Sequence, residues 1–134
     1  MKKRILAVDD DPTALGALRQ ILSQKGYEVA TAGSSEEALG LLGAGFDLFI
    51  LDVAMHGMSG YDLCRRIRAT AATSQTPVVF LTAKGQLMDM AEGQAAGSDL
   101  YLVKPVLATK LLNMVGMFLS DDAPLGKKRD SAAS

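Results

Sequence analysis

Five polar side chains stand directly after short apolar runs, where the carboxyl end of a buried strand would place them. They are Asp9, Asp10, Asp52, Thr82 and Lys104. If the runs are parallel strands of one sheet, these groups converge on one edge, because ligands bind outside the carboxyl ends of such strands. Carboxylates about 4 Å apart repel by roughly 4 kcal/mol per pair at a protein-like dielectric, so we expect the three to stay ionised only around a cation.

The oxygen ligands indicate which cation and which reaction to expect. Mg²⁺ suits a pocket that supplies one or two carboxylates and leaves its other positions to water or phosphate. Phosphoryl transfer commonly uses Mg²⁺ and a fixed lysine, here Lys104, because the charge on the phosphoryl oxygens must be neutralised. Asp52 stands apart from Asp9 and Asp10 and can attack through a carboxylate oxygen to form an aspartyl phosphate.

The elements that must position these residues follow from hydrophobic periodicity. Apolar runs predict strands near 5–8, 27–32, 48–53, 77–82 and 100–103. Helical spacing follows each run, with the last three helices expected near 63–67, 87–96 and 108–119. The runs at 48–51 and 78–81 are apolar without alternation, as in strands buried on both faces. Five strands alternating with five helices predict an α/β fold with a doubly wound parallel sheet.

The first two helices carry explicit start signals. Asp11 is placed to cap the first, Pro12 fits its first turn, and Gly26 supplies its stop. Ser34 and Glu37 have the spacing of a capping box ahead of a helix that we expect to include Leu42.

Length and composition narrow the function further. A chain of 134 residues has room for one domain, which we expect at 1–120 with a flexible tail at 121–134 and no separate effector domain. A net charge of -1 excludes bulk attraction to nucleic acid or an anionic membrane, and no apolar run is long enough for a membrane span. The lone cysteine, Cys64, is predicted to pack in the core. Because one cysteine cannot form an intramolecular disulfide, we expect a reducing compartment and a cytoplasmic protein.

Four motifs, in order and at suitable spacings, resemble the receiver domain of two-component response regulators. They are residues 5–12, the block 47–60, the pair Thr82-Ala83 and the run 97–105. Each alone is a weak signal, but the resemblance covers about residues 3–120. It implies a flavodoxin-like fold with strand order 2-1-3-4-5. It also implies a switch, not an enzyme, that takes a phosphoryl group from a sensor histidine kinase or a phosphotransfer protein.

The resemblance also implies a role for each matching acidic position. Asp52 matches the phosphoacceptor and is also expected to hold Mg²⁺. Asp10 matches the acidic residue that ligates Mg²⁺ directly, and Asp9 its neighbour that acts largely through water. The backbone carbonyl of Ala54 matches the remaining protein ligand.

Other matching positions are implied to bind the phosphoryl group and transmit the signal. Thr82 would donate its hydroxyl to a phosphoryl oxygen, next to Ala83, and Lys104 would form an ion pair with another oxygen. Tyr101 matches the switch aromatic, whose ring turns inward when Thr82 moves toward the phosphate. The bond between Lys104 and Pro105 is expected to be cis.

The chain also departs from the family pattern. His56 stands where proline is common, and we interpret it as a solvent-exposed residue that relaxes its loop. Ser59 stands where aspartate is frequent but can still cap the next helix. Ala54 and Lys84 match positions that tune hydrolysis, and neither is an acid or amide that could orient water. We therefore predict that the protein is not specialised for very rapid self-dephosphorylation.

The fourth and fifth helices are the expected output face. Lys110 is the one charged residue in 107–119, and apolar residues including Met114 and Met117 cover more of that helix than one buried stripe needs. Met88 and Met90 add to this surface on the preceding helix. We expect the face to dock a downstream protein or a second copy of the chain.

Three other functions compete with the switch. A pseudo-receiver would use the same fold as a constitutive docking module, although the intact acidic cluster argues against it. An aspartate-nucleophile phosphohydrolase places its nucleophile on the first strand in an Asp-x-Asp loop, whereas Asp52 follows the third strand. A flavin-binding domain shares the strand pattern, but its phosphate cradle would need glycine and hydroxyl donors where residues 9–12 are acidic.

Overall fold

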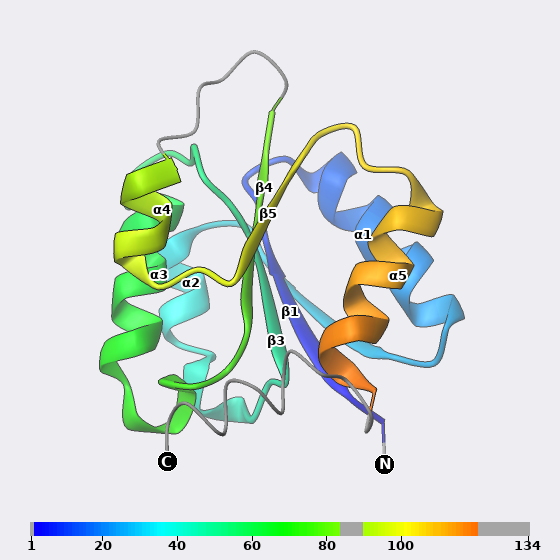
Figure 1. Cartoon of the computed structure of the whole chain (residues 1–134), viewed down its shortest axis with the longest axis horizontal. Coiled ribbons are helices and arrows are strands. Elements are labelled where there is room, and N and C mark those ends of the chain that lie inside the picture. Colours follow the sequence, from blue (N-terminus) through cyan, green and yellow to red (C-terminus); the bar gives the residue numbers. More distant parts are fainter. Residues whose placement is uncertain (1, 84–89, 121–134) are drawn as a thin grey trace.

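Five parallel strands form the centre of the structure, and helices cover both faces of the sheet (Figure 1). The computed structural model describes residues 2–83 and 90–120. The strands are β1 (Arg4–Val8), β2 (Glu28–Ala32), β3 (Leu48–Asp52), β4 (Val78–Thr82) and β5 (Leu100–Val103). The helices are α1 (Pro12–Gln24), α2 (Ser35–Leu39), α3 (Gly60–Ala69), α4 (Met90–Ala96) and α5 (Ala108–Leu119), with 3-10 turns at Leu42–Ala44 and Ala71–Thr73.

The strand order is β2-β1-β3-β4-β5, which confirms the predicted doubly wound fold. Figure 1 shows α1 and α5 on one face of the sheet and α2, α3 and α4 on the other. The register aligns Val8 with Leu51 and Asp52 with Leu81, so β1, β3 and β4 end at the same edge. The order reverses between β1 and β3, and a ligand site is expected outside the carboxyl ends there.

The residues of the central strands pack alternately into two cores. In β3, Leu48 and Ile50 join the core under α1 and α5, whereas Phe49 and Leu51 join the core under the other three helices. None of the four is more than 1% exposed. Burial on both faces explains why this strand lacks polar alternation, and each such side chain contributes about 1.5 to 3 kcal/mol.

Three helices begin at side-chain caps that the sequence predicts. Oxygens of Asp11, Ser34 and Ser59 accept backbone N–H groups two or three residues further on, at 2.9, 3.0 and 3.1 Å. The capping box is shifted by one residue, because Glu37 Oε1 accepts the N–H of Gly33 at 2.9 Å. These bonds satisfy N–H groups that have no partner within the helix.

Some element ends differ from the prediction. The second helix stops at Leu39, and Leu42 packs into the core from a separate 3-10 turn after Gly40 caps the helix end. β2 begins one residue late because the N–H of Tyr27 donates to the carbonyl of Leu22 and closes the end of α1. The start of the predicted helix at 87–89, with Lys84 and Met88, lies outside the described residues.

The apolar surface of α5 is smaller than the sequence suggests. The prediction that Met114 belongs to an exposed docking face is wrong, because this side chain is 3% exposed and packs in the core. Met117 is 48% exposed and Leu107 is 75% exposed. Most apolar side chains of α5 therefore pack in the core against the sheet, since residues three and four apart share the buried face of a helix.

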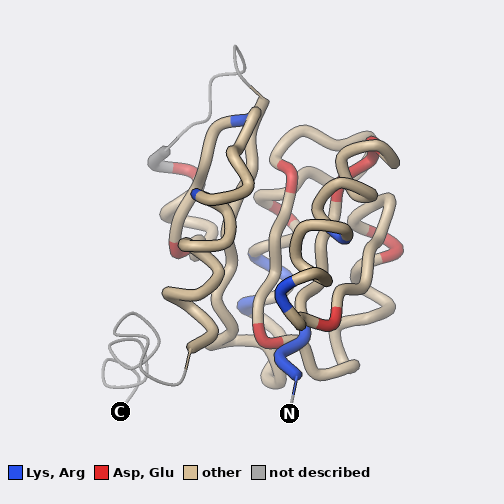
Figure 2. Tube along the Cα trace, turned by 90° about the vertical axis from the view of Figure 1, so that its right-hand side faces the viewer, with Lys and Arg blue, Asp and Glu red and all other residues tan. Residues whose placement is uncertain are grey.

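The described part of the chain shows neither a spanning helix nor a single-sign surface. No helix described here is both long enough and apolar enough to cross a membrane. Figure 2 shows basic and acidic positions interspersed along the described trace, in keeping with the net charge of -1.

Arg68, on α3, links that helix to the segments that precede β4 and β5. Its guanidinium donates to the carbonyl of Gly97 at 2.9 Å and to that of Thr76 at 2.6 Å, and it pairs with Asp99 at 3.0 Å. Asp99 also accepts the N–H of Val78, at the start of β4. The pair is largely buried, with side chains 17% and 13% exposed, and burial lowers the pKa of Arg68.

Replacing Arg68 with methionine is expected to lower the free energy of unfolding by about 3 kcal/mol, because it breaks a largely buried ion pair and removes the hydrogen bonds of the guanidinium to two backbone carbonyls. Urea denaturation followed by circular dichroism measures this. Arg65→Met is the matched control, since its pairs with Asp62 and Glu92 are exposed and each should contribute less than about 1 kcal/mol. Equal losses in the two variants would contradict the assignment.

Candidate functional site

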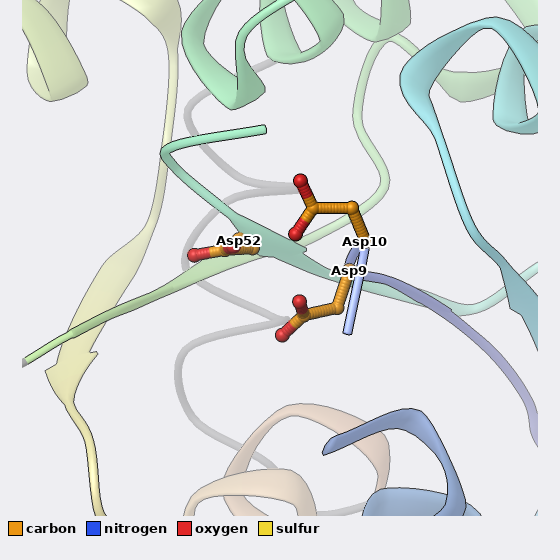
Figure 3. A group of neighbouring side chains, drawn as sticks. All are labelled: Asp9, Asp10 and Asp52. Atoms are coloured by element: carbon orange, nitrogen blue, oxygen red, sulfur yellow. The ribbon is translucent and has the colours of Figure 1, made fainter. Parts of the chain in front are cut away.

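Three carboxylates meet at the carboxyl edge of the sheet, as the sequence predicts. Asp9 and Asp10 follow β1, and Asp52 is the last residue of β3, the strand paired with β1. Figure 3 shows the three side chains side by side, and oxygens from all three lie within 4.8 Å of one another. This spacing would let one hard cation contact or share a water shell with all of them.

Asp9 is the most constrained of the three. It is 2% exposed, and one oxygen accepts the N–H of Asp11 at 2.9 Å. The other oxygen lies 2.7 Å from Lys104 Nζ, whereas the nearest oxygen of Asp52 is 3.9 Å from the same ammonium. Lys104 therefore reaches the site as predicted, but its close partner is Asp9.

Asp52 sits in an environment that disfavours its charge. It is 7% exposed, and its pKa is raised to about 6, first by burial and then by the negative charge of Asp9, against the opposing charge of Lys104. Burial and repulsion from Asp9 and Asp10 thus both disfavour the charged form of Asp52. A cation in the cluster would lower this pKa, because opposite charge favours the ionised form.

Asp10 is held by the loop that follows β3. Its Oδ2 accepts the backbone N–H of His56 at 3.2 Å and lies 2.8 Å from His56 Nδ1. The hydrogen bond from the imidazole is the main reason that the pKa of Asp10 is lowered. The His56 side chain is fully exposed, as predicted, but it ties the loop to the site instead of relaxing it.

The same loop is anchored to α2 and to its own start. Ser35 Oγ donates to the carbonyl of Met58 at 2.9 Å, and the N–H of Met58 donates to Glu36 at 3.3 Å. The N–H of Gly60 donates to the carbonyl of Val53 at 2.9 Å. Because the chain is held at these points, Ala54 is presented at an exposed position two residues beyond Asp52.

Thr82 places a buried hydroxyl group at the carboxyl edge of the sheet. It ends β4, beside β3, and is 2% exposed. Among the described residues, its Oγ1 is the one buried side-chain polar atom that makes no hydrogen bond. Since leaving such a group unpaired costs about 1 to 3 kcal/mol, the hydroxyl is suited to an incoming ligand oxygen.

The remaining predicted residues also lie near this edge. The bond between Lys104 and Pro105 is cis, as predicted, and the N–H of Lys104 donates to the carbonyl of Thr82 at 2.7 Å. Tyr101 lies on β5, half-buried, and packs against the core under α2, α3 and α4. Ala83 follows Thr82 directly and is half-buried.

The residues that could hold a cation and a phosphoryl group are therefore together. Three carboxylates offer only oxygen ligands, a lysine lies within reach, and a buried hydroxyl has no partner. This donor set fits Mg²⁺ with a phosphoryl group better than a soft metal, which would take sulfur or imidazole ligands. Cys64 is no part of it, since its thiol is buried and donates to the carbonyl of Ala96.

Comparison with known families assigns this arrangement. The sequence model described as the response regulator receiver domain matches residues 5–116. The chain belongs to this family. Response regulators receive signals from histidine kinases in two-component signalling, so this receiver domain is a signalling module.

Two curated relatives and one solved structure illustrate the similarity. The chain is 42% identical over 105 residues to the uncharacterized transcriptional regulatory protein YrkP of Bacillus subtilis, matching 78% of this chain and 44% of that protein. It is 38% identical over 116 residues to the DNA-binding response regulator MtrA of Mycolicibacterium smegmatis, matching 86% and 50%. The receiver domain thus spans about half the length of these relatives.

The structural match is to a chain of similar size. The chemotaxis protein CheY4 of Vibrio cholerae superimposes with a TM-score of 0.84 at 33% identity, and the match covers 89% of this receiver domain and 100% of that chain. The TM-score shows that the two chains share the fold.

Two features of the structure were not predicted from the sequence, the contact of His56 with Asp10 and the anchoring of Arg68. Of the two, only the contact of His56 had a signal in the sequence, a residue with an N–H where the family commonly has proline.

Proposed function

We propose that this receiver domain is a phosphorylation-activated switch in which Asp52 accepts a phosphoryl group from the phosphohistidine of a sensor kinase or phosphotransfer protein. The observation that carries the proposal is one juxtaposition. The carboxylate of Asp52 lies at the carboxyl edge of the sheet beside two further carboxylates, the ammonium of Lys104 and the Thr82 hydroxyl, which makes no hydrogen bond.

Asp52 would act as the nucleophile. With its pKa raised to about 6, it is mainly ionised at neutral pH, and its desolvated oxygen is more reactive than one in water. A carboxylate oxygen attacks phosphorus, the P–N bond to the phosphoimidazole breaks, and the electron pair of that bond returns to the imidazole nitrogen. The phosphoryl group is thereby transferred without a change of oxidation state.

The acidic neighbours would hold Mg²⁺, which supplies neutralising charge at the phosphoryl oxygens. Asp10 and Asp52 are proposed as direct ligands together with the carbonyl of Ala54, and Asp9 as a ligand through water. Asp9 also orients Lys104, whose ammonium lies 2.7 Å from it. In the switch, Lys104 turns from Asp9 toward the new phosphoryl charge, which attracts it more strongly than a carboxylate does.

The readout would begin at Thr82. Its hydroxyl donates to a phosphoryl oxygen, which gives this buried group the partner it lacks. Movement of Thr82 toward the phosphate makes room for the ring of Tyr101 to turn inward. This change alters β5 and the helices beside it, where Leu100, Val103, Leu107 and Met117 are the exposed large apolar residues among those described.

The output is then a change of contacts. We propose that the face formed by α4, β5 and α5 docks a downstream protein or a second copy of the domain. Residues 1–120 would form the receiver unit and 121–134 a tail. The domain would neither bind nucleic acid directly nor enter a membrane, and its phosphate would not be shed very rapidly, because Ala54 cannot orient an attacking water.

The test is phosphorylation from a small donor. With Mg²⁺ and acetyl phosphate, the wild-type protein is expected to gain the mass of one phosphoryl group, and Asp52→Ala is expected to gain none. Chelating Mg²⁺ with EDTA should prevent labelling of the wild type. Asp11→Asn is the matched control, since this neighbouring acid caps α1 through a side-chain oxygen and should leave labelling intact.

Two outcomes would replace the proposal. No mass gain in the wild type, with Mg²⁺ bound or not, would favour a constitutive docking module. Repeated release of phosphate from phosphate esters, lost in Asp52→Ala, would favour a phosphohydrolase.

A further inference from the structure

His56 gives this chain a contact that proline at the same position could not make. Its backbone N–H and its Nδ1 both approach one oxygen, Asp10 Oδ2, at 3.2 and 2.8 Å. Proline has no N–H and no imidazole, so it would leave that oxygen without either contact. The departure from the family pattern therefore lies against one of the proposed metal ligands.

Two donors on one carboxylate oxygen limit what else that oxygen can bind. A carboxylate oxygen has two lone pairs in its plane, and here two donors from His56 lie within hydrogen-bond distance of the same oxygen. A cation that binds through Oδ2 must therefore displace one of these donors. The backbone N–H is fixed by the loop, which Ser35 and Glu36 hold through Met58. The imidazole is the partner that can move.

The imidazole has an unobstructed route away. The His56 side chain is fully exposed, whereas the Asp10 side chain is 29% exposed and stays with the cluster. Releasing the ring therefore disturbs no packing, and its cost is that of one hydrogen bond. A neutral imidazole donates through Nδ1–H as a protonated one does, so the contact does not depend on the charge of the ring.

We propose that His56 is a positioning residue that occupies Asp10 Oδ2 and competes with Mg²⁺ for it, so that the ring must swing into solvent as the cation enters. The inference rests on the proposed function, because it takes Asp10 as a direct ligand. Its consequence is a receiver domain with weakened Mg²⁺ affinity, in which phosphorylation depends on a higher cation concentration.

Mg²⁺ affinity measured by isothermal titration calorimetry at pH 8 tests this. His56→Ala is expected to bind Mg²⁺ about fivefold more tightly than the wild type, the factor that corresponds to one net hydrogen bond. His56→Phe, which keeps the bulk and loses the donor, should match His56→Ala. His56→Asn, whose amide can donate from a similar position, should restore affinity close to that of the wild type.

Glu36→Gln serves as the matched control. It weakens another tether of the same loop without touching Asp10, so its Mg²⁺ affinity should stay at the wild-type value. The chain has 1 histidine, which also provides a direct readout by NMR. The imidazole resonances of the wild type should shift on Mg²⁺ addition with the dissociation constant found by calorimetry.

Several results would overturn the inference. Equal or weaker Mg²⁺ binding by His56→Ala overturns the competition alone and leaves the proposed function standing. Tighter binding by Glu36→Gln, to the extent of His56→Ala, would assign the effect to loop loosening. No Mg²⁺ binding by the wild type or His56→Ala would overturn the competition and the proposed Mg²⁺ site together.

Discussion

Replacing Gly60 with alanine is expected to lower the free energy of unfolding by about 3 kcal/mol and to slow phosphoryl transfer to Asp52 about a hundredfold. A Cβ at this position would overlap the backbone carbonyl oxygen of Asp52 and lie 3.0 Å from Val53 Cα. These atoms belong to the backbone at the end of β3, so they can move only by displacing the residue proposed to accept the phosphoryl group.

The two effects are measured separately, by chemical denaturation and by the rate of labelling with acetyl phosphate. Gly16→Ala is the matched control, since Gly16 lies on the helix α1 and a Cβ there has no neighbouring atom within 4 Å outside its own helix turn. That change should raise the free energy of unfolding by about 0.5 to 1 kcal/mol, because alanine is the better helix former, and leave the labelling rate unchanged. Wild-type stability and rate in Gly60→Ala would show that the end of β3 is not rigid.

Replacing Asp52 with asparagine is expected to stabilise the metal-free protein by about 2 to 3 kcal/mol at pH 7.5. The pKa of Asp52 is about 6 in the folded protein, against an ordinary value of 3.8 for an aspartate carboxyl. Between these values the folded state keeps a proton that the unfolded chain has lost. The wild type therefore loses stability as the pH rises from about 4 to 6, and remains at that lower stability above it.

Urea denaturation in EDTA at a series of pH values measures the difference. The advantage of Asp52→Asn should shrink as the pH falls toward 4, and Mg²⁺ should reduce it at pH 7.5 by binding the folded wild type. Asp62→Asn is the control, because this exposed carboxylate should change stability by less than about 0.5 kcal/mol. A constant difference between pH 4.5 and 7.5 would assign the stabilisation to something other than the charge of Asp52.

Local patterns accounted for the architecture. Uninterrupted apolar runs such as 48–51 predicted strands buried on both faces, and Phe49 and Ile50 do pack into opposite cores. Caps at Asp11, Ser34 and Ser59 predicted where helices begin. These signals are readable because a side chain's face and a helix end depend on residues a few positions away.

The convergence of Asp9, Asp10 and Asp52 was predictable for a related reason. Each follows an apolar strand, and parallel strands bring such positions to one edge whatever the details of packing. Element ends were less certain. α2 is shorter than expected because Gly40 caps it, and most of the apolar excess of α5 proved to be core, Met114 included.

The fold class, the acidic edge and the family could thus be predicted from the amino-acid sequence. The sequence could not determine which atoms pair there, because those partners lie far apart along the chain. Lys104 lies close to Asp9 rather than Asp52 across 95 positions, and His56 reaches Asp10 across 46. Such choices depend on ångström-scale distances set by strand register and loop anchoring, and no local pattern of residues encodes them.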